Sequence, residues 1–153
     1  MNRLYGPFIA GPGAVGLLVL RLVFGLGIML HGLPKISNPM GWMPAGSPVP
    51  GPLQGASAFA EFGGGILWIL GLLTPLASLL LIANMSVAAW THISRGDPFV
   101  AAGGGGSYEL ALLYLAAAVL LLLVGPGRYS LDALLFRATH EREATHRPRA
   151  TSV

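Results

Sequence analysis

The sequence predicts an all-α integral membrane protein, in which four helices form an antiparallel up-down-up-down bundle. Composition is the first reason, because 54% of the 153 residues are hydrophobic and only 10% are charged, against about 25% charged residues in a soluble domain. The mean hydropathy of +0.68 is the second reason. The third is that apolar segments of about 20 residues, enough to cross a bilayer, recur between stretches rich in proline and glycine.

The first half of the chain is expected to hold a short lead and two spans. The lead covers residues 1–13, and the first span runs from about residue 14 to about residue 33, where Pro34 ends the helix. A loop rich in proline and glycine follows. The second span covers about residues 57–73, with Ser57 as its N-cap.

The second half is expected to return twice across the bilayer. Thr74-Pro75 makes a tight turn, so the third span, about residues 76–94, must lie antiparallel to the second. The fourth span covers about residues 108–124, and the sequence Gly-Pro-Gly stops it. The four spans together make one transmembrane domain, residues 14–124.

The residues after the fourth span are expected to leave the lipid. Residues 125–143 are predicted to form an amphipathic interfacial segment whose short helix Ser130 caps, and residues 144–153 to form a disordered tail. Most of the net charge of +3 comes from the arginines of this part of the chain: Arg128, Arg137, Arg142, Arg147 and Arg149. The positive-inside rule therefore places both termini in the cytoplasm of a bacterium and makes the protein multi-pass in its cytoplasmic membrane.

Composition also limits the chemistry. The chain has no cysteine, which excludes disulfides, thiol catalysis, zinc–thiolate sites and iron–sulfur ligation by this chain. The basic residues are explained by membrane topology, so the bilayer is the expected partner and nucleic acid is not.

Seven polar side chains lie within or beside the apolar spans: Arg21, His31, Lys35, Glu61, Asn84, His92 and Glu109. Such residues are costly in a bilayer unless they find a partner, a cavity or a route to the interface. In the predicted topology, spans one and three end at the outer face and spans two and four begin there. Five of the seven, all but Arg21 and Asn84, are therefore expected at the outer end of the bundle. Arg21 is about 15 Å deeper than His31 at 1.5 Å rise per residue, and Asn84 is at mid-depth.

The functional interpretation is that these seven residues contribute to one polar pocket that opens to the outer leaflet. The pocket would bind a quinone or another small redox partner, with the histidines and glutamates moving protons. His31 and His92 could instead hold a haem or a metal ion; a two-metal site is disfavoured, because no helix carries Glu-x-x-His. The structural alternative is that these residues only stabilise the helices. His31 and His92 lie near helix C-termini, and Glu61 and Glu109 lie near N-termini, where each charge complements the helix dipole.

Two further features have simple structural interpretations. Gly63–Gly65 lies inside a span and is expected to allow a close helix contact. Trp42, in the loop after the first span, favours a position of that loop at the membrane interface.

Four stretches resemble the DoxX family of small bacterial four-helix membrane proteins: RLVFGLGIMLHGLPK from residue 21, AEFGGGILWILGLLTP from residue 60, Glu109, and GPGRYSLDALL from residue 125. The resemblance covers about residues 17–135. It implies a four-helix bundle in the cytoplasmic membrane. Some relatives are similar to the small subunit of a thiosulfate:quinone oxidoreductase, and others occur in membrane oxidoreductase assemblies linked to oxidative stress.

The resemblance also implies which residues to test. Arg21, His31, Lys35, Glu61 and Glu109 match positions that recur in the family, whereas Asn84 and His92 are nominated from helix geometry alone. The expected function is that of a DoxX-like subunit of a quinone-linked redox assembly, accessory to other membrane subunits and with no catalytic residue assigned. A structural or assembly subunit and a small transporter are the alternatives.

Overall fold

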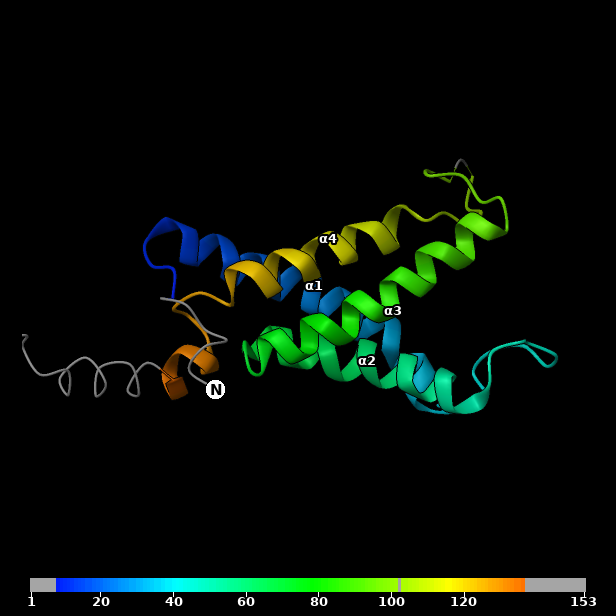
Figure 1. Cartoon of the computed structure of the whole chain (residues 1–153), viewed down its shortest axis with the longest axis horizontal. Helices are drawn as coiled ribbons and strands as arrows, with labels where there is room; N and C mark the ends of the chain where they lie inside the picture. Colours follow the sequence, from blue (N-terminus) through cyan, green and yellow to red (C-terminus); the bar gives the residue numbers. More distant parts are fainter. Residues whose placement is uncertain (1–7, 102, 137–153) are drawn as a thin grey trace, which may run out of the picture.

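A computed structural model describes residues 8–101 and 103–136, and its architecture is helical throughout, with no strand in this part of the chain. The long helices are α1 (Pro12–Ile36), α2 (Gly51–Leu70), α3 (Thr74–Ser94) and α4 (Glu109–Val124). Residues 131–136 are also helical. The all-α prediction is therefore confirmed for the described residues (Figure 1).

α1 and α2 run in opposite directions along each other. Arg21, early in α1, contacts Trp68 near the end of α2, whereas Lys35 at the end of α1 contacts Glu61 earlier in α2. α3 begins just after α2 and returns along it, so that Asn84 reaches the same Glu61. α1 packs most extensively on α2, and α4 on α3.

Glycines let α1 and α2 approach closely. A Cβ atom added to Gly32 would collide with the backbone nitrogen of Phe62, and one added to Gly65 would lie 2.7 Å from the carbonyl oxygen of Gly25. Small residues at such a contact allow backbone-to-backbone packing. This confirms the expected role of the triple glycine for Gly65, while Gly64 contacts α3 through Leu81 and Gly63 has open space beside it.

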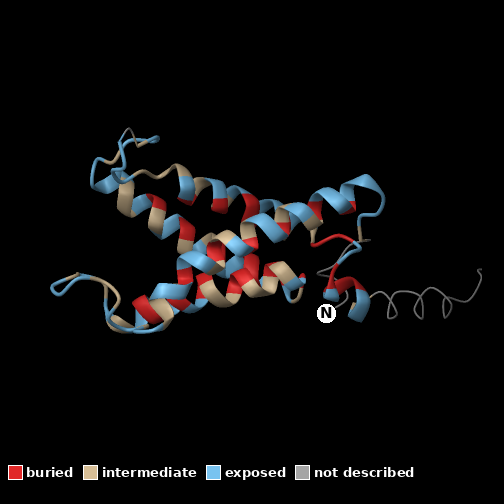
Figure 2. Ribbon diagram, turned by 180° about the vertical axis from the view of Figure 1, so that it is seen from behind, coloured by how far each residue is buried: buried red, intermediate tan, exposed pale blue. Residues whose placement is uncertain are grey.

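The surface of the helices is largely aliphatic. Large apolar side chains are exposed on each of the long helices α1 to α4, and Figure 2 marks exposed residues along the helices in pale blue. Large apolar patches on a surface mark contact with lipid or with another protein. Two of the described helices, Pro12–Ile36 and Thr74–Ser94, are long and apolar enough to cross a membrane, and Glu109–Val124 is apolar but shorter.

The expected end of the first helix is wrong. Pro34 lies inside α1, which continues to Ile36. A proline at this position removes only one intrahelical hydrogen bond, the one that its N–H would donate to the carbonyl of Leu30. The three extra residues bring Lys35 into the helix and fix its direction.

The expected starts of the second and third helices are also wrong. α2 begins at Gly51, six residues before Ser57, with Pro52 in its first turn, where the fixed φ of proline suits a helix start. α3 begins at Thr74, because the turn lies earlier, with Gly71 and Leu73 both in the left-handed region. Part of the predicted loop is therefore helix.

The chain after α4 folds back onto the helices. Ser130 caps the helical residues 131–136, since its hydroxyl accepts a hydrogen bond from the backbone N–H of Ala133 at 3.1 Å. Leu131 and Leu134 are exposed while Asp132 is buried, so the described part of the amphipathic segment has two different faces. The rest of that segment, residues 1–7 of the lead and the whole 144–153 tail lie outside the described residues.

Candidate functional site

The centre of the candidate site is an ion pair between α1 and α2. The Nζ of Lys35 lies 2.6 Å from both carboxylate oxygens of Glu61, and the Nδ2 of Asn84 donates a further hydrogen bond to Glu61 Oε1 at 3.0 Å. The Glu61 side chain is 6% exposed and that of Lys35 is 21% exposed. The close approach of α1 to α2 places the two residues opposite each other, so the ammonium neutralises a nearly buried carboxylate.

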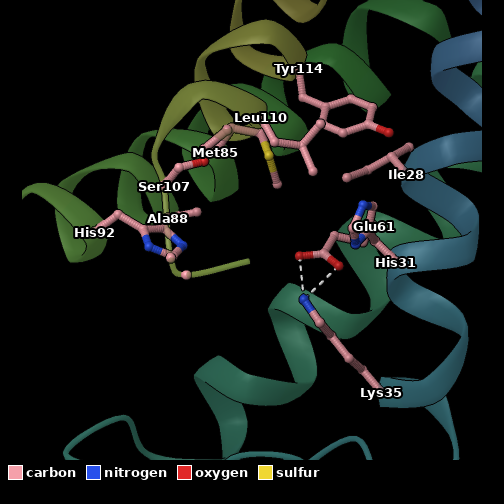
Figure 3. A pocket seen from close by; sticks show the side chains of 13 residues that line it. Ile28, His31, Lys35, Glu61, Met85, Ala88, His92, Ser107, Leu110 and Tyr114 are labelled. Atoms are coloured by element: carbon pink, nitrogen blue, oxygen red, sulfur yellow. Dashed lines mark hydrogen bonds and ion pairs between the residues drawn. The ribbon is translucent and has the colours of Figure 1, made fainter. Parts of the chain in front are cut away.

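A cavity of about 350 Å³ lies beside this ion pair. It is lined by parts of all four helices and by the glycine-rich segment before α4, and its walls are of mixed character (Figure 3). The apolar walls come from Ile28, Met85, Ala88, Leu110 and Ala111. The polar lining side chains are His31, Lys35, Glu61, His92, Ser107 and Tyr114. Such a cavity can hold a small amphiphilic molecule, with a few polar groups to orient it.

The two histidines lie on different walls of the cavity. His31 comes from α1, and its ring meets that of Tyr114 edge-on with centroids 6.1 Å apart. His92 comes from α3, and its Nδ1 lies 2.7 Å from Oδ2 of Asp97. The carboxylate fixes the orientation of the His92 ring and favours a proton on Nδ1. Figure 3 shows the His92 ring on the opposite side of the cavity from Lys35.

The structure brings together most of the residues nominated from the sequence. His31, Lys35, Glu61 and His92 line the cavity, and Asn84 supports it through Glu61. Among the described residues, neither Arg21 nor Glu109 belongs to the cavity wall. Glu109 is the first residue of α4, where its charge suits the helix N-terminus.

Arg21 belongs to a separate cluster at the other end of the helices. Its guanidinium donates to four backbone carbonyls, those of Trp68 at 3.0 Å, Pro126 at 2.7 Å, Tyr129 at 2.9 Å and Ile69 at 3.5 Å. The residue is 1% exposed. Arg21 therefore joins the end of α2 to the segment after α4, and its place in the nominated pocket is corrected: backbone oxygens, not a ligand cavity, satisfy it.

Sequence reasoning missed three residues of these two regions. Tyr114 and Asp97 both belong to the cavity region, and Asp132 caps the start of α3, where its oxygens accept from the backbone N–H groups of Leu73 at 2.8 Å and Thr74 at 2.9 Å. Tyr114 could have been found as the one hydroxyl within an otherwise apolar α4. Asp132 lies in the GPGRYSLDALL stretch that resembles the family, but nothing in the sequence links it to partners 58 and 59 residues away. Asp97 had no signal, because its contact with His92 depends on the geometry of the turn after α3.

The described residues contain no cluster of side chains suited to a metal centre. Within residues 8–101 and 103–136, no group of three or more histidine, aspartate and glutamate side chains is arranged to hold a metal ion. His31 and His92 do both line the cavity, so a haem held by these two residues stays a prediction.

Two family models match this chain. One, described as DoxX, matches residues 16–93, and the other, described as TQO small subunit DoxD, matches residues 57–147; each covers half of the chain or more. A protein of Haemophilus influenzae, described as an uncharacterized protein, is 32% identical over 121 residues, which cover 77% of this chain and 89% of that protein. No solved structure matches the chain.

Proposed function

Because this chain belongs to the DoxX family, we propose that it is a small membrane-embedded subunit of a quinone-linked oxidoreductase assembly. The cavity beside Glu61 binds the quinone headgroup, and the side chains around it exchange protons with that headgroup. Other membrane subunits supply the remaining redox centres. The match to a model described as TQO small subunit DoxD supports an accessory role in such an assembly.

In this proposal the four helices form an antiparallel bundle that spans the bacterial cytoplasmic membrane. α1 and α3 have the length and hydropathy of spans, and α2 and α4 cross with them because each is paired along its length with one of these two. The arginine-rich tail lies in the cytoplasm. Lys35, Glu61 and His92 then lie near the outer face, where a headgroup reaches them from the lipid.

The lining of the cavity fits a quinone ring. The volume of about 350 Å³ lies in the range of small-molecule pockets. The apolar walls suit the flat faces of the ring, and the N–H and O–H donors suit its two carbonyl oxygens. A bound quinone supplies a carrier for two electrons and two protons.

The protein side chains have distinct tasks in this site. Lys35 and His31 offer N–H donors to a carbonyl oxygen, and the Lys35 ammonium stabilises negative charge on it. Glu61 holds Lys35 in place and can take up a proton at Oε2, which among the described residues accepts a hydrogen bond from Lys35 alone. His92, oriented by Asp97, exchanges protons with water at the mouth of the cavity.

One observation carries the proposal: a nearly buried carboxylate, paired with an ammonium, faces a cavity that also contains two imidazoles. Ionisable groups inside a membrane segment are costly, so a cluster of them around a cavity favours a functional site over a purely structural one.

The test is binding of a short-chain ubiquinone and a short-chain menaquinone to the protein in lipid nanodiscs. We expect at least one of them to bind, and Glu61→Gln to raise its Kd about tenfold, because a hydrogen bond to a charged partner contributes about 1.5 kcal/mol or more. Glu109→Gln is the matched control: it removes a carboxylate from outside the cavity wall and leaves the Kd unchanged.

Two outcomes would contradict the proposal. If neither quinone binds and none is extracted with the purified protein, the chain is an assembly subunit, or a small transporter if liposomes containing it alone take up solutes. If Glu61→Gln and Glu109→Gln change the Kd equally, the quinone binds somewhere other than the cavity.

A further inference from the structure

Lys35 has a second neighbour besides Glu61. Its Nζ lies 4.4 Å from the centroid of the Trp42 ring, which belongs to the loop between α1 and α2. An ammonium within about 6 Å of an indole face is attracted by the negative charge of the π-system. The ammonium is therefore held between a carboxylate on one side and an aromatic face on the other.

Trp42 is itself fixed by the start of α2. Its indole N–H donates to the backbone oxygen of Gln54 at 2.9 Å. The Gln54 side chain is buried and ties down the rest of the loop, since its Oε1 accepts from the N–H of Met43 at 3.0 Å and its Nε2 donates to the oxygen of Val49 at 2.9 Å. The ring thus has a fixed place from which to act on Lys35.

Lysine needs such support more than arginine does. Its four-carbon stem is flexible and its ammonium is strongly hydrated, and lysines near a membrane interface readily extend toward water. Lys35 is the second-last residue of α1 and keeps 21% of its side chain exposed. Without the indole face, water would compete with Glu61 for the ammonium.

We propose that Trp42 is a positioning residue: it holds the Lys35 ammonium on Glu61 and so sets how tightly the cavity binds its ligand. Gln54 in turn positions Trp42. The part of this inference that concerns ligand affinity rests on the proposed quinone site. The part that concerns Lys35 does not, and the two parts are tested separately.

Lys35 is the only lysine in the sequence, which makes its accessibility measurable at a single side chain. The probe is acetylation by an amine-reactive ester in nanodiscs, followed by mass spectrometry of the peptide that contains residue 35. Trp42→Leu keeps apolar bulk and removes the π-face, and we expect it to speed acetylation about fivefold. Trp42→Phe restores an aromatic face but not the N–H that donates to Gln54, so we expect its rate to lie between those of the native protein and Trp42→Leu.

Trp90→Leu is the control for loss of an indole elsewhere, because Trp90 is 71% exposed on α3. We expect its acetylation rate to equal that of the native protein. Thermal unfolding of all three variants separates a local effect on Lys35 from loss of the fold. Equal acetylation rates for Trp42→Leu and the native protein, with the fold intact, would overturn the inference.

Ligand affinity is tested with a double-mutant cycle in which short-chain ubiquinone and menaquinone are the probes. If Trp42 acts through Lys35, Trp42→Leu weakens binding about fivefold in the native background and not at all in a Lys35→Met background. An equal loss in both backgrounds overturns the inference, because Trp42 would then contact the ligand or only support the loop. If no quinone binds to the native protein, the proposed function fails, and the acetylation rates alone decide the role of Trp42.

Discussion

Arg21 and Lys35 are two cations of one helix, and they are satisfied in different ways. The Arg21 guanidinium is 1% exposed and points its N–H groups at backbone carbonyls of α2 and of the segment after α4. The Lys35 ammonium lies at the edge of a cavity and pairs with one carboxylate. Backbone carbonyls are fixed by the helices and cannot move away from the guanidinium. The Lys35 ammonium, beside a cavity, can instead turn from the Glu61 carboxylate to a ligand.

The difference indicates a division of tasks along α1. At the Arg21 end, the segment after α4 closes onto the helices, and Asp132 caps α3 while its own N–H donates to Gly71. At the Lys35 end, the polar groups surround about 350 Å³ of open space. The Arg21 end stabilises the packing of the helices, and the Lys35 end contains the cavity of the candidate site.

The largest effect is expected at the Arg21 end. Arg21→Met leaves buried carbonyls without donors, and we expect it to lower the free energy of unfolding by about 3 kcal/mol. Detergent-titrated unfolding followed by circular dichroism measures this loss. Quinone binding by the folded fraction should stay within about twofold of native, since Arg21 is remote from the cavity wall. An unchanged unfolding midpoint would refute the structural role assigned to this end.

A smaller effect is expected from the helix cap. Asp132 accepts one hydrogen bond at each carboxylate oxygen, from the N–H groups of Leu73 and Thr74. Asp132→Asn keeps only one of these two acceptors and removes a negative charge from the start of α3. We expect a loss of about 1 kcal/mol in the same unfolding measurement. Ser57→Ala is the control, because Ser57 lies inside α2 and caps no helix. A loss for Ser57→Ala as large as that for Asp132→Asn would argue against the cap.

The smallest effect on stability is expected at the cavity. Lys35→Met removes an ion pair that borders the cavity, where water can solvate the Glu61 carboxylate in place of the ammonium, and Asn84 keeps its hydrogen bond to Glu61. The loss is therefore closer to that of a partly exposed pair, about 0–1 kcal/mol, than to that of a fully buried one. We expect unfolding to change by no more than about 1 kcal/mol and the Kd for a short-chain quinone to rise about tenfold. If Lys35→Met lowers the free energy of unfolding as much as Arg21→Met does and leaves the quinone Kd unchanged, the Lys35 end has the same structural role as the Arg21 end.

The amino-acid sequence alone determined the helical class, the four long helices found in residues 8–101 and 103–136, and the grouping of His31, Lys35, Glu61 and His92 at one end. These follow from hydropathy and from short connections, which fix where consecutive helices begin and end. Helix ends were less predictable. Local propensity predicts a helix end at Pro34 and a helix start at Ser57, but it does not include the packing that extends α1 and α2 past those residues.

Tertiary structure alone decided what each polar side chain does. The sequence pattern groups Arg21 with the pocket residues, because it cannot reveal that the partners of Arg21 are backbone carbonyls, which every residue carries. Trp42 read as an interface aromatic, and only the fold of its loop brings it over Lys35. Hydropathy acts locally along the chain, whereas a hydrogen bond or a cation–π contact requires two distant segments to be placed within a few ångströms.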